Sequence, residues 1–284
     1  FAASLTLAAG GTLVIGGGTA NVLAQVPTNG AAFGLNVAGN AAISGNLSLG
    51  GTGVTVPVRA AVGGNLALDG NARFVVYASA ATDFSFATLY DEATRVVVQG
   101  AVSLAGTSRI IPDADPVTGA PVRFQAGSVT VAEGAAFDAD ARGYAWTTFY
   151  GELPYFVRAF AGSSTIPSTK SCCYAPGGGG GDGQNDRGAG YGGLGDRGGW
   201  LAGRVYGYRY APFLPGSCGR EAAAADRGGG SVWIDCAGQF SLLGTVHACG
   251  TNNASKSFTS SGGGIWINAR AFTATYGGAN PSNQ

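Results

Sequence analysis

A short phrase recurs near the C-terminal end of this sequence. GGGSVWI at residues 228–234 returns as GGGIWIN at residues 262–268. The segment FSLLGTVHACG (240–250), which lies between the two copies, predicts two short strands joined by a glycine turn. A glycine run, a strand with Trp at its centre, a second strand and the glycine run again form the pattern of stacked coils. In such a fold each coil buries its apolar face against the next.

The first half of the chain repeats a similar unit of strand, glycine turn and strand. Its short strands carry apolar side chains at positions i and i+2 and end at Gly, Asn or Asp, which tolerate tight turns. The even spacing and the similar turns favour parallel coils. A β-sandwich, in which strands follow one another about every 8–12 residues, is the alternative. Clear examples of the unit are LNVAGNAAIS (35–44), LALDGNARFVV (66–76), VVVQGAVSL (96–104) and VTVAEGAAF (129–137).

Composition is compatible with a packed β fold and argues against nucleic-acid binding. Glycine makes up 51 of 284 residues, yet 45% of the chain is hydrophobic, so a core can form. Charged residues make up 11%, with 16 basic and 16 acidic side chains, which leaves no basic surface for nucleic acid or an anionic membrane. No apolar run approaches about 18 residues, so no transmembrane helix is predicted. No charged residue precedes Arg59, which indicates either a face covered by neighbouring subunits or one solvated by Thr, Asn and Ser.

We predict one all-β domain over residues 1–284, a parallel β-solenoid. It comprises N-terminal coils (1–143), a Gly- and Tyr-rich insertion (144–227), C-terminal coils (228–276) and a polar tail (277–284). Pure linkers contain few aromatic residues, so the insertion is expected to form a contact surface. The side chains expected at interfaces are Leu5 and Leu7 in the first strand, and Tyr191, Trp200, Tyr206, Tyr208 and Tyr210 in the insertion.

Several segments together resemble one family. VAEGAAFDADARGYAW (131–146), the glycine-rich loop with GYGG (177–199), YAPFLPGSCG (210–219) and the repeated GGGSVWI phrase resemble the large secreted Gly-rich parallel β-helix proteins, the adhesin-like and autotransporter-passenger-like group. The resemblance implies a right-handed β-helix. It also implies a structural, adhesive or matrix role outside the cell.

The cysteines indicate disulfide bonds rather than a metal site. No C-x-x-C motif occurs and the chain has a single histidine. The chain begins with Phe and contains no Met, so we expect a processed, secreted protein, in which disulfides form. Cys236 and Cys249 are the first expected pair, and the odd number leaves one thiol free or linked to another chain. The five candidates are Cys172, Cys173, Cys218, Cys236 and Cys249. The sequons at Asn46 and Asn253 matter only in a glycosylating organism.

Few residues offer catalytic chemistry. His247, the only histidine, lies in a strand pattern and is interpreted as structural. Asp138 and Asp140 share one face of a strand, and Arg142 continues their row. An ion row is favoured there, with the paired carboxylates of a glycosidase as the alternative. No catalytic or cofactor-binding residue is predicted.

Two further patterns suggest ligands but have simpler interpretations. Asp182, Asp186 and Asp196 in the glycine-rich loop are the candidate Ca²⁺ ligands, although a glycine run matches many motifs. Trp233 and Trp266 would stack in register if the coils stack. Packing is favoured for them over an outward carbohydrate-binding ladder.

We therefore expect an extracellular structural protein that associates with copies of itself as a filament, sheath or matrix subunit. Unpaired strand edges at the ends of a solenoid template end-to-end stacking, and the first strand, SLTL, shows no polar cap. It could also be donated to the next subunit. The alternative is an adhesin or carbohydrate-binding module that uses the aromatic residues of 144–210. A polysaccharide-active enzyme is the least favoured function.

Overall fold

The structure is a computed structural model. It describes residues 33–51, 58–81, 91, 93–147, 189–192, 205–218, 227–251 and 260–275, together with the backbone of six short strands elsewhere. Residue 33 and residues 146–147 are also described by their backbone alone. The statements below concern these residues.

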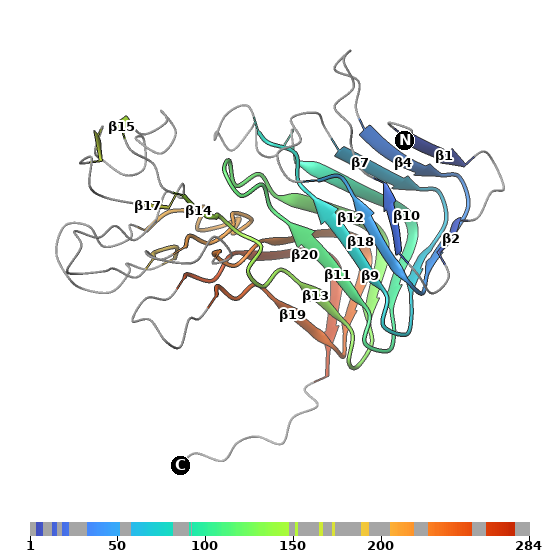
Figure 1. Cartoon of the computed structure of the whole chain (residues 1–284). Helices are drawn as coiled ribbons and strands as arrows, with labels where there is room; N and C mark the ends of the chain where they lie inside the picture. The colour runs from blue at the N-terminus through green and yellow to red at the C-terminus, as the bar shows by residue number, and fades with distance from the viewer. Residues whose placement is uncertain are drawn as a thin grey trace.

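Most strands belong to two sheets, called sheet A and sheet B here. The alternation of apolar and polar side chains that predicts strands produces parallel pairs throughout both sheets (Figure 1). Sheet A contains β1 (Ser4–Leu7), β4 (Phe33–Val37), β7 (Val58–Val62), β10 (Thr94–Leu104), β12 (Val122–Val131), β18 (Val232–Leu242) and β20 (Ile265–Ala274), with the shorter β2 (Leu13–Ile15), β5 (Ala41–Ile43) and β8 (Leu66–Leu68) beside them. Sheet B contains β3 (Thr19–Val22), β6 (Asn46–Leu49), β9 (Arg73–Tyr77), β11 (Arg109–Asp113), β13 (Ala136–Asp138) and β19 (Thr245–His247).

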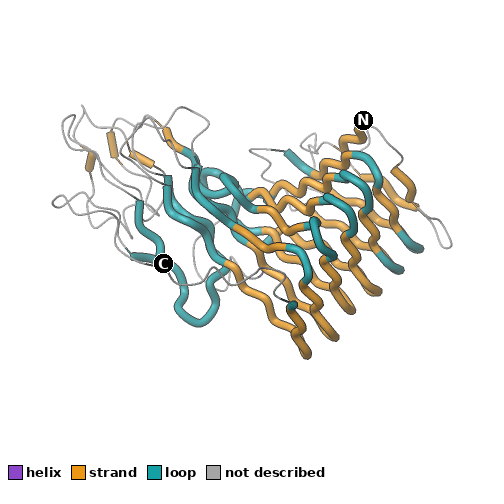
Figure 2. The backbone as a smooth tube through the Cα atoms, turned by 90° about the horizontal axis from the view of Figure 1, so that it is seen from below, coloured by secondary structure: helices purple, strands orange, loops and turns teal. Residues whose placement is uncertain are grey.

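The chain alternates between the two sheets. It runs along sheet A, turns into sheet B and returns to sheet A beside its previous pass, so that successive passes lie side by side (Figure 2). The predicted all-β class with parallel stacking is confirmed, and it is compatible with a parallel β-solenoid. The parallel pairing within both sheets differs from the antiparallel pairing of a β-sandwich. No helix among the described residues is long and apolar enough to cross a membrane.

Residues 144–227 depart from this pattern. The described strands there are short and antiparallel: β14 (Trp146–Thr147) pairs with β17 (Cys172–Cys173), and β15 (Gly151–Glu152) pairs with β16 (Thr165–Ile166). After them, β18 returns to sheet A and pairs directly with β12.

The predicted glycine turns are present where sheet A passes into sheet B. Gly70, Gly106 and Gly134 all have positive φ, from 58° to 82°. They also stack closely: a Cβ on Gly106 would lie 2.6 Å from the carbonyl oxygen of Gly70, and one on Gly134 would lie 2.7 Å from that of Gly106. Both the conformation and the close approach therefore require glycine at this corner.

Three predicted details differ from the structure. VVVQGAVSL forms the single strand β10, with a register irregularity between Val98 and Ala101 where two strands and a turn were predicted. Alternation over VTVPV predicts a strand at residues 54–58, of which 54–57 lie outside the described part, whereas β7 runs from Val58 to Val62. β3 was not predicted, because TANV lacks a strong apolar alternation.

The core lies between the two sheets and is almost entirely aliphatic and aromatic. Its largest fully buried members include Phe74, Phe137 and Phe240. A second buried cluster lies on the opposite face of sheet A, where Trp233 packs against the insertion. The buried members of that cluster are Ala93, Tyr144, Tyr206, Ala211, Phe213, Leu214, Cys218 and Trp233.

Candidate functional site

One edge of sheet A is open at β20. Among the described strands, β20 pairs only with β18, in parallel register from Val232↔Ile265 to Leu242↔Ala274. The strand is ten residues long. Its outer side presents backbone N–H and C=O groups that can pair with a further strand.

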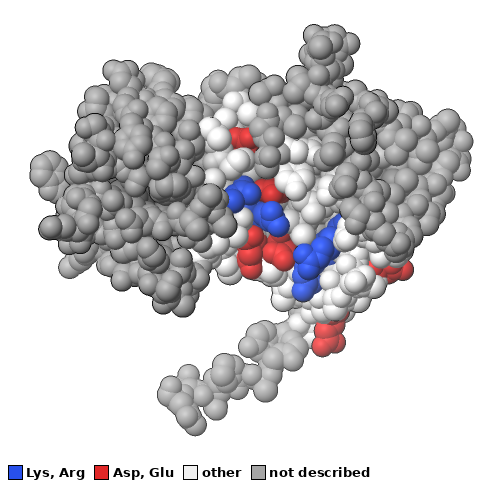
Figure 3. Space-filling model, viewed as in Figure 1, with Lys and Arg blue, Asp and Glu red and all other residues white. Residues whose placement is uncertain are grey.

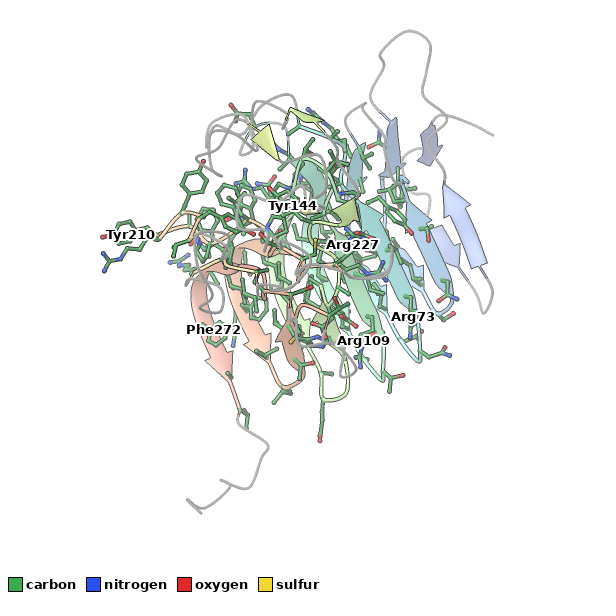
Figure 4. The ribbon with its side chains drawn as sticks, turned by 60° about the vertical axis from the view of Figure 1, so that its left-hand side comes forward. Arg73, Arg109, Tyr144, Tyr210, Arg227 and Phe272 are labelled. Carbon is green, nitrogen blue, oxygen red and sulfur yellow. The ribbon has the colours of Figure 1, made fainter. Side chains whose placement is uncertain are left out.

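The side chains of β20 are exposed where those of β18 are buried. Phe240 is 0% exposed, whereas Phe272, its register partner, is 55% exposed. The two rings stack at 5.5 Å with an interplanar angle of 6°. Ile267, the partner of the fully buried Ile234, is only partly buried. Among the described residues, nothing covers the apolar side chains at this end of the stack, and Figure 4 shows Phe272 on β20.

The insertion covers one end of the same strand. Trp266 stacks on Trp233 at 5.1 Å, as predicted from the repeated phrase, and Phe213 of the insertion lies 4.7 Å from Trp233. Trp233 is completely buried. These aromatic residues are used for packing in the region that the structure describes.

The interface candidates of the insertion differ in exposure. Tyr206 is buried, and its hydroxyl donates to the carbonyl of Pro215. Tyr191 packs on Tyr206 at 5.0 Å, and Tyr208 stacks near Phe213 at 5.5 Å. Burial raises the pKa of Tyr191 to about 12. Tyr210, in contrast, is 86% exposed and points away from the fold (Figure 4). The side chains of Leu5, Leu7 and Trp200 lie outside the described residues.

A polar groove runs over the outer face of sheet A next to the aromatic residues. Arg123 donates to Asp235, and its guanidinium lies 4.8 Å from the centre of the Trp233 ring. Side-chain amides lie on both sides of this ion pair. The groove is lined among others by Gln99, Gln125, Trp266 and Asn268.

Sheet B ends in a charged cluster at the same end of the stack. Asp138 of β13 is the register partner of His247 of β19. The imidazole Nδ1 lies 2.9 Å from Asp140 Oδ2 and 3.6 Å from Asp138 Oδ1. Figure 3 shows acidic and basic side chains gathered over this sheet. Nothing in the sequence links the histidine to the two carboxylates, and the structure brings them together.

Backbone groups hold the two carboxylates in place. The amide of Asp140 donates to Asp138 Oδ1 at 3.1 Å, and the amide of Cys249 donates to Asp140 Oδ1 at 2.6 Å. Partial burial by itself would raise the pKa of Asp140. The hydrogen bonds from Cys249 and His247, with the charge of His247, outweigh burial and place the pKa below its usual value. Burial, together with the Asp140 charge, raises the pKa of the Cys249 thiol.

Of the predicted ion row, Asp138 and Asp140 lie together, whereas Arg142 does not pair with them. Arg109 Nε lies 3.9 Å from Asp138 Oδ2 and supplies the basic partner. Arg142 instead pairs at 2.9 Å with the buried Asp113, which Arg227 also contacts at 2.7 Å. Arg142 turns away because Asp113 is 2% exposed, and a buried carboxylate needs charged partners.

The expected Cys236–Cys249 pair is wrong, because both thiols are free. Cys236 lies in sheet A, buried, with its Sγ 3.2 Å from the carbonyl of Gln239. Cys249 is exposed and follows the last strand of sheet B. No two of the three cysteines whose side chains are described, Cys218, Cys236 and Cys249, are bonded to each other.

The remaining predicted sites fall mostly outside the described residues. These include the side chains of Cys172 and Cys173, the candidate Ca²⁺ ligands Asp182, Asp186 and Asp196, and the sequon at Asn253. Asn46 is described, and it is exposed at the start of β6.

Comparison with known proteins gives no match. No known protein family matches the chain, and neither does any curated protein or solved structure. Function is therefore inferred from the described residues themselves.

Proposed function

We propose that this protein is an extracellular structural subunit, a right-handed parallel β-helix that assembles end to end through the open edge of sheet A. The observation that carries the proposal is the contrast between Phe240, which is completely buried, and its stacked partner Phe272, which is 55% exposed. An added strand beyond β20 would bury Phe272 as β20 buries Phe240. Burying one such side chain contributes about 1.5–3 kcal/mol.

The occupant of this edge is a second copy of the chain. β1 forms the other edge of sheet A and runs parallel to every strand between, so β1 of one subunit can pair with β20 of another without a change of direction. This head-to-tail contact joins two different surfaces, so it propagates as a filament when the rotation between subunits does not close a ring. The right hand is proposed because crossovers between parallel strands of one sheet are nearly always right-handed.

The extracellular location is supported by composition and by sequence resemblance. The low share of charged residues, 11%, suits a protein whose surface is covered in an assembly. The Gly-rich phrases resemble those of secreted β-helix proteins, as described above. The protein acts through its surface in this proposal, without catalysis.

The test compares two aspartate variants by negative-stain electron microscopy and analytical ultracentrifugation. Phe272→Asp places a charge on the open edge, whereas Leu243→Asp, at a residue 52% exposed in the turn after β18, is the matched control. We expect filaments from the wild type and from Leu243→Asp, and dispersed monomers from Phe272→Asp. A chain without residues 1–18, which lacks β1, is also expected to stay monomeric and folded. Wild-type monomers at high concentration, or normal filaments from Phe272→Asp, would refute the proposal.

Carbohydrate binding is a second candidate because of the groove on sheet A. Trp266 lines this groove, and Gln125 and Asn268 offer amides beside the Arg123–Asp235 ion pair. Glycan-array binding lost in Gln125→Ala and Asn268→Ala, and retained in Tyr210→Ala, would support this site. Loss in Tyr210→Ala alone would instead place glycans on the exposed part of the insertion.

A further inference from the structure

The charged end of sheet B contains three side chains with the donor atoms of a metal site. A carboxylate oxygen from each of Asp138 and Asp140 and an imidazole nitrogen of His247 lie within 4.8 Å of one another. We infer that Asp138, Asp140 and His247 bind a divalent transition-metal ion, Zn²⁺ foremost.

Two of the three donor-atom spacings are close to those around a tetrahedral ion, and all three atoms lie within 4.8 Å of one another. Ligands about 2.0–2.2 Å from Zn²⁺ stand roughly 3.3–3.5 Å from one another. His247 Nδ1 lies 2.9 Å from Asp140 Oδ2 and 3.6 Å from Asp138 Oδ1. Small side-chain rotations therefore suffice to place an ion among the three atoms.

The backbone holds two of the ligands in the required arrangement. Asp138 and His247 are register partners on the neighbouring strands β13 and β19. The Cys249 amide fixes Asp140 Oδ1, which leaves Oδ2 directed at the imidazole. Hydrogen bonds of this kind orient ligating carboxylates in metal sites and support their affinity.

The donor types select among metals. Oxygen-only sites suit Mg²⁺ and Ca²⁺, whereas an imidazole with carboxylates suits Zn²⁺ and its neighbours in the first transition row. The ligand side chains of Asp138 and His247 are 29% and 30% exposed, so an ion can enter and water can complete its coordination.

Two other side chains, those of Arg109 and Cys249, lie near the cluster. Arg109 Nε lies 3.9 Å from Asp138 Oδ2, the oxygen that is not paired with the histidine, and Nη1 of the same guanidinium donates to the Gly134 carbonyl. The exposed Cys249 thiol lies next to Asp140.

The experiment uses the full chain with Zn²⁺ as the probe. Isothermal titration calorimetry and metal analysis after dialysis should give one ion per chain for the wild type. His247→Gln and Asp140→Asn are each expected to weaken binding at least tenfold. Asp69→Asn, which removes an exposed carboxylate from a turn on the same sheet, is expected to bind as the wild type does. Circular dichroism confirms that each variant is folded.

A second readout identifies the ligands. Co²⁺ in place of Zn²⁺ should give the visible absorption of a tetrahedral site, lost in His247→Gln. Cys249→Ser is expected to retain the ion. No uptake by the folded wild type, or uptake that persists in His247→Gln while it disappears in Cys249→Ser, would overturn the site. Because the readout is metal content, its failure is independent of whether filaments form.

Discussion

β18 and β20 carry nearly the same sequence phrase but differ in burial. Both begin after a glycine run, and their tryptophans and phenylalanines stack in register. β18 has neighbours on both sides and buries Phe240 completely, whereas β20 has a described neighbour on one side and leaves Phe272 55% exposed. Burial in this fold is therefore set by the neighbouring strand and not by the strand's own residues.

The two sheets also end differently. At the same end of the stack, sheet A finishes in β20, which carries the single charged residue Arg270, whereas sheet B finishes at β19 beside a cluster of Asp138, Asp140 and His247. Charges at a strand edge discourage pairing with another chain. In the proposed assembly, sheet A is the sheet that continues into a partner, and sheet B is the one that ends.

The largest expected effect comes from removing the matched phenylalanines. Phe240→Ala should destabilise the monomer by about 3–5 kcal/mol, because it leaves a cavity in a closed core. Phe272→Ala should cost less than about 1 kcal/mol, because its ring is already largely in water. Urea unfolding, at protein concentrations too low for assembly, measures the loss of unfolding free energy in both variants. Equal losses would mean that another segment covers β20.

A smaller effect is expected from the glycine run that precedes β20. A Cβ on Gly263 would lie 1.6 Å from the carbonyl oxygen of Gly230, so Gly263→Ala requires the backbone to shift. We expect a loss of about 1–3 kcal/mol in unfolding free energy. At Gly262 the nearest atom would be 3.4 Å away, so Gly262→Ala is the control and should stay within about 0.5 kcal/mol. If Gly262→Ala were equally harmful, flexibility and not close packing would explain the run.

Local pattern predicted much of the fold. The phrase GGGSVWI indicated stacked strands because it repeats. Turns such as that at Gly70 could be predicted because their backbone conformation requires glycine. The pairing of Trp233 with Trp266 followed from the same repeat. These features depend on residues close together in one coil or on an explicit repeat.

The candidate sites could not be predicted in the same way. Asp138 meets His247 because β13 and β19 become neighbours after a long insertion, and no repeat links these two strands in the sequence. Proximity in the sequence likewise suggested the Cys236–Cys249 pair, although Cys236 lies in sheet A and Cys249 follows the last strand of sheet B. Exposure of Phe272 depends on what lies beyond β20, which the composition of the strand does not encode.

The smallest expected effect tests whether the charged end of sheet B is structurally fixed. The pKa of Asp140 in the folded protein lies below its ordinary value of 3.8, so its interactions stabilise the fold fully above that pH. This contribution is lost as the pH falls below 3.8 through the lower folded value. Melting temperatures measured from pH 6 down to about pH 3 should therefore fall more steeply for the wild type than for Asp140→Asn.

Asp69→Asn is the control for this comparison and should keep the wild-type slope. The effect is expected to be small because the Asp140 side chain is 42% exposed and its pairing with His247 is screened by solvent. A wild-type profile as flat as that of Asp140→Asn would show that the cluster contributes nothing to the folded state. The charged cluster would then not stabilise the last strands of sheet B. The ends of the two sheets would differ in the polarity of their side chains and not in stability.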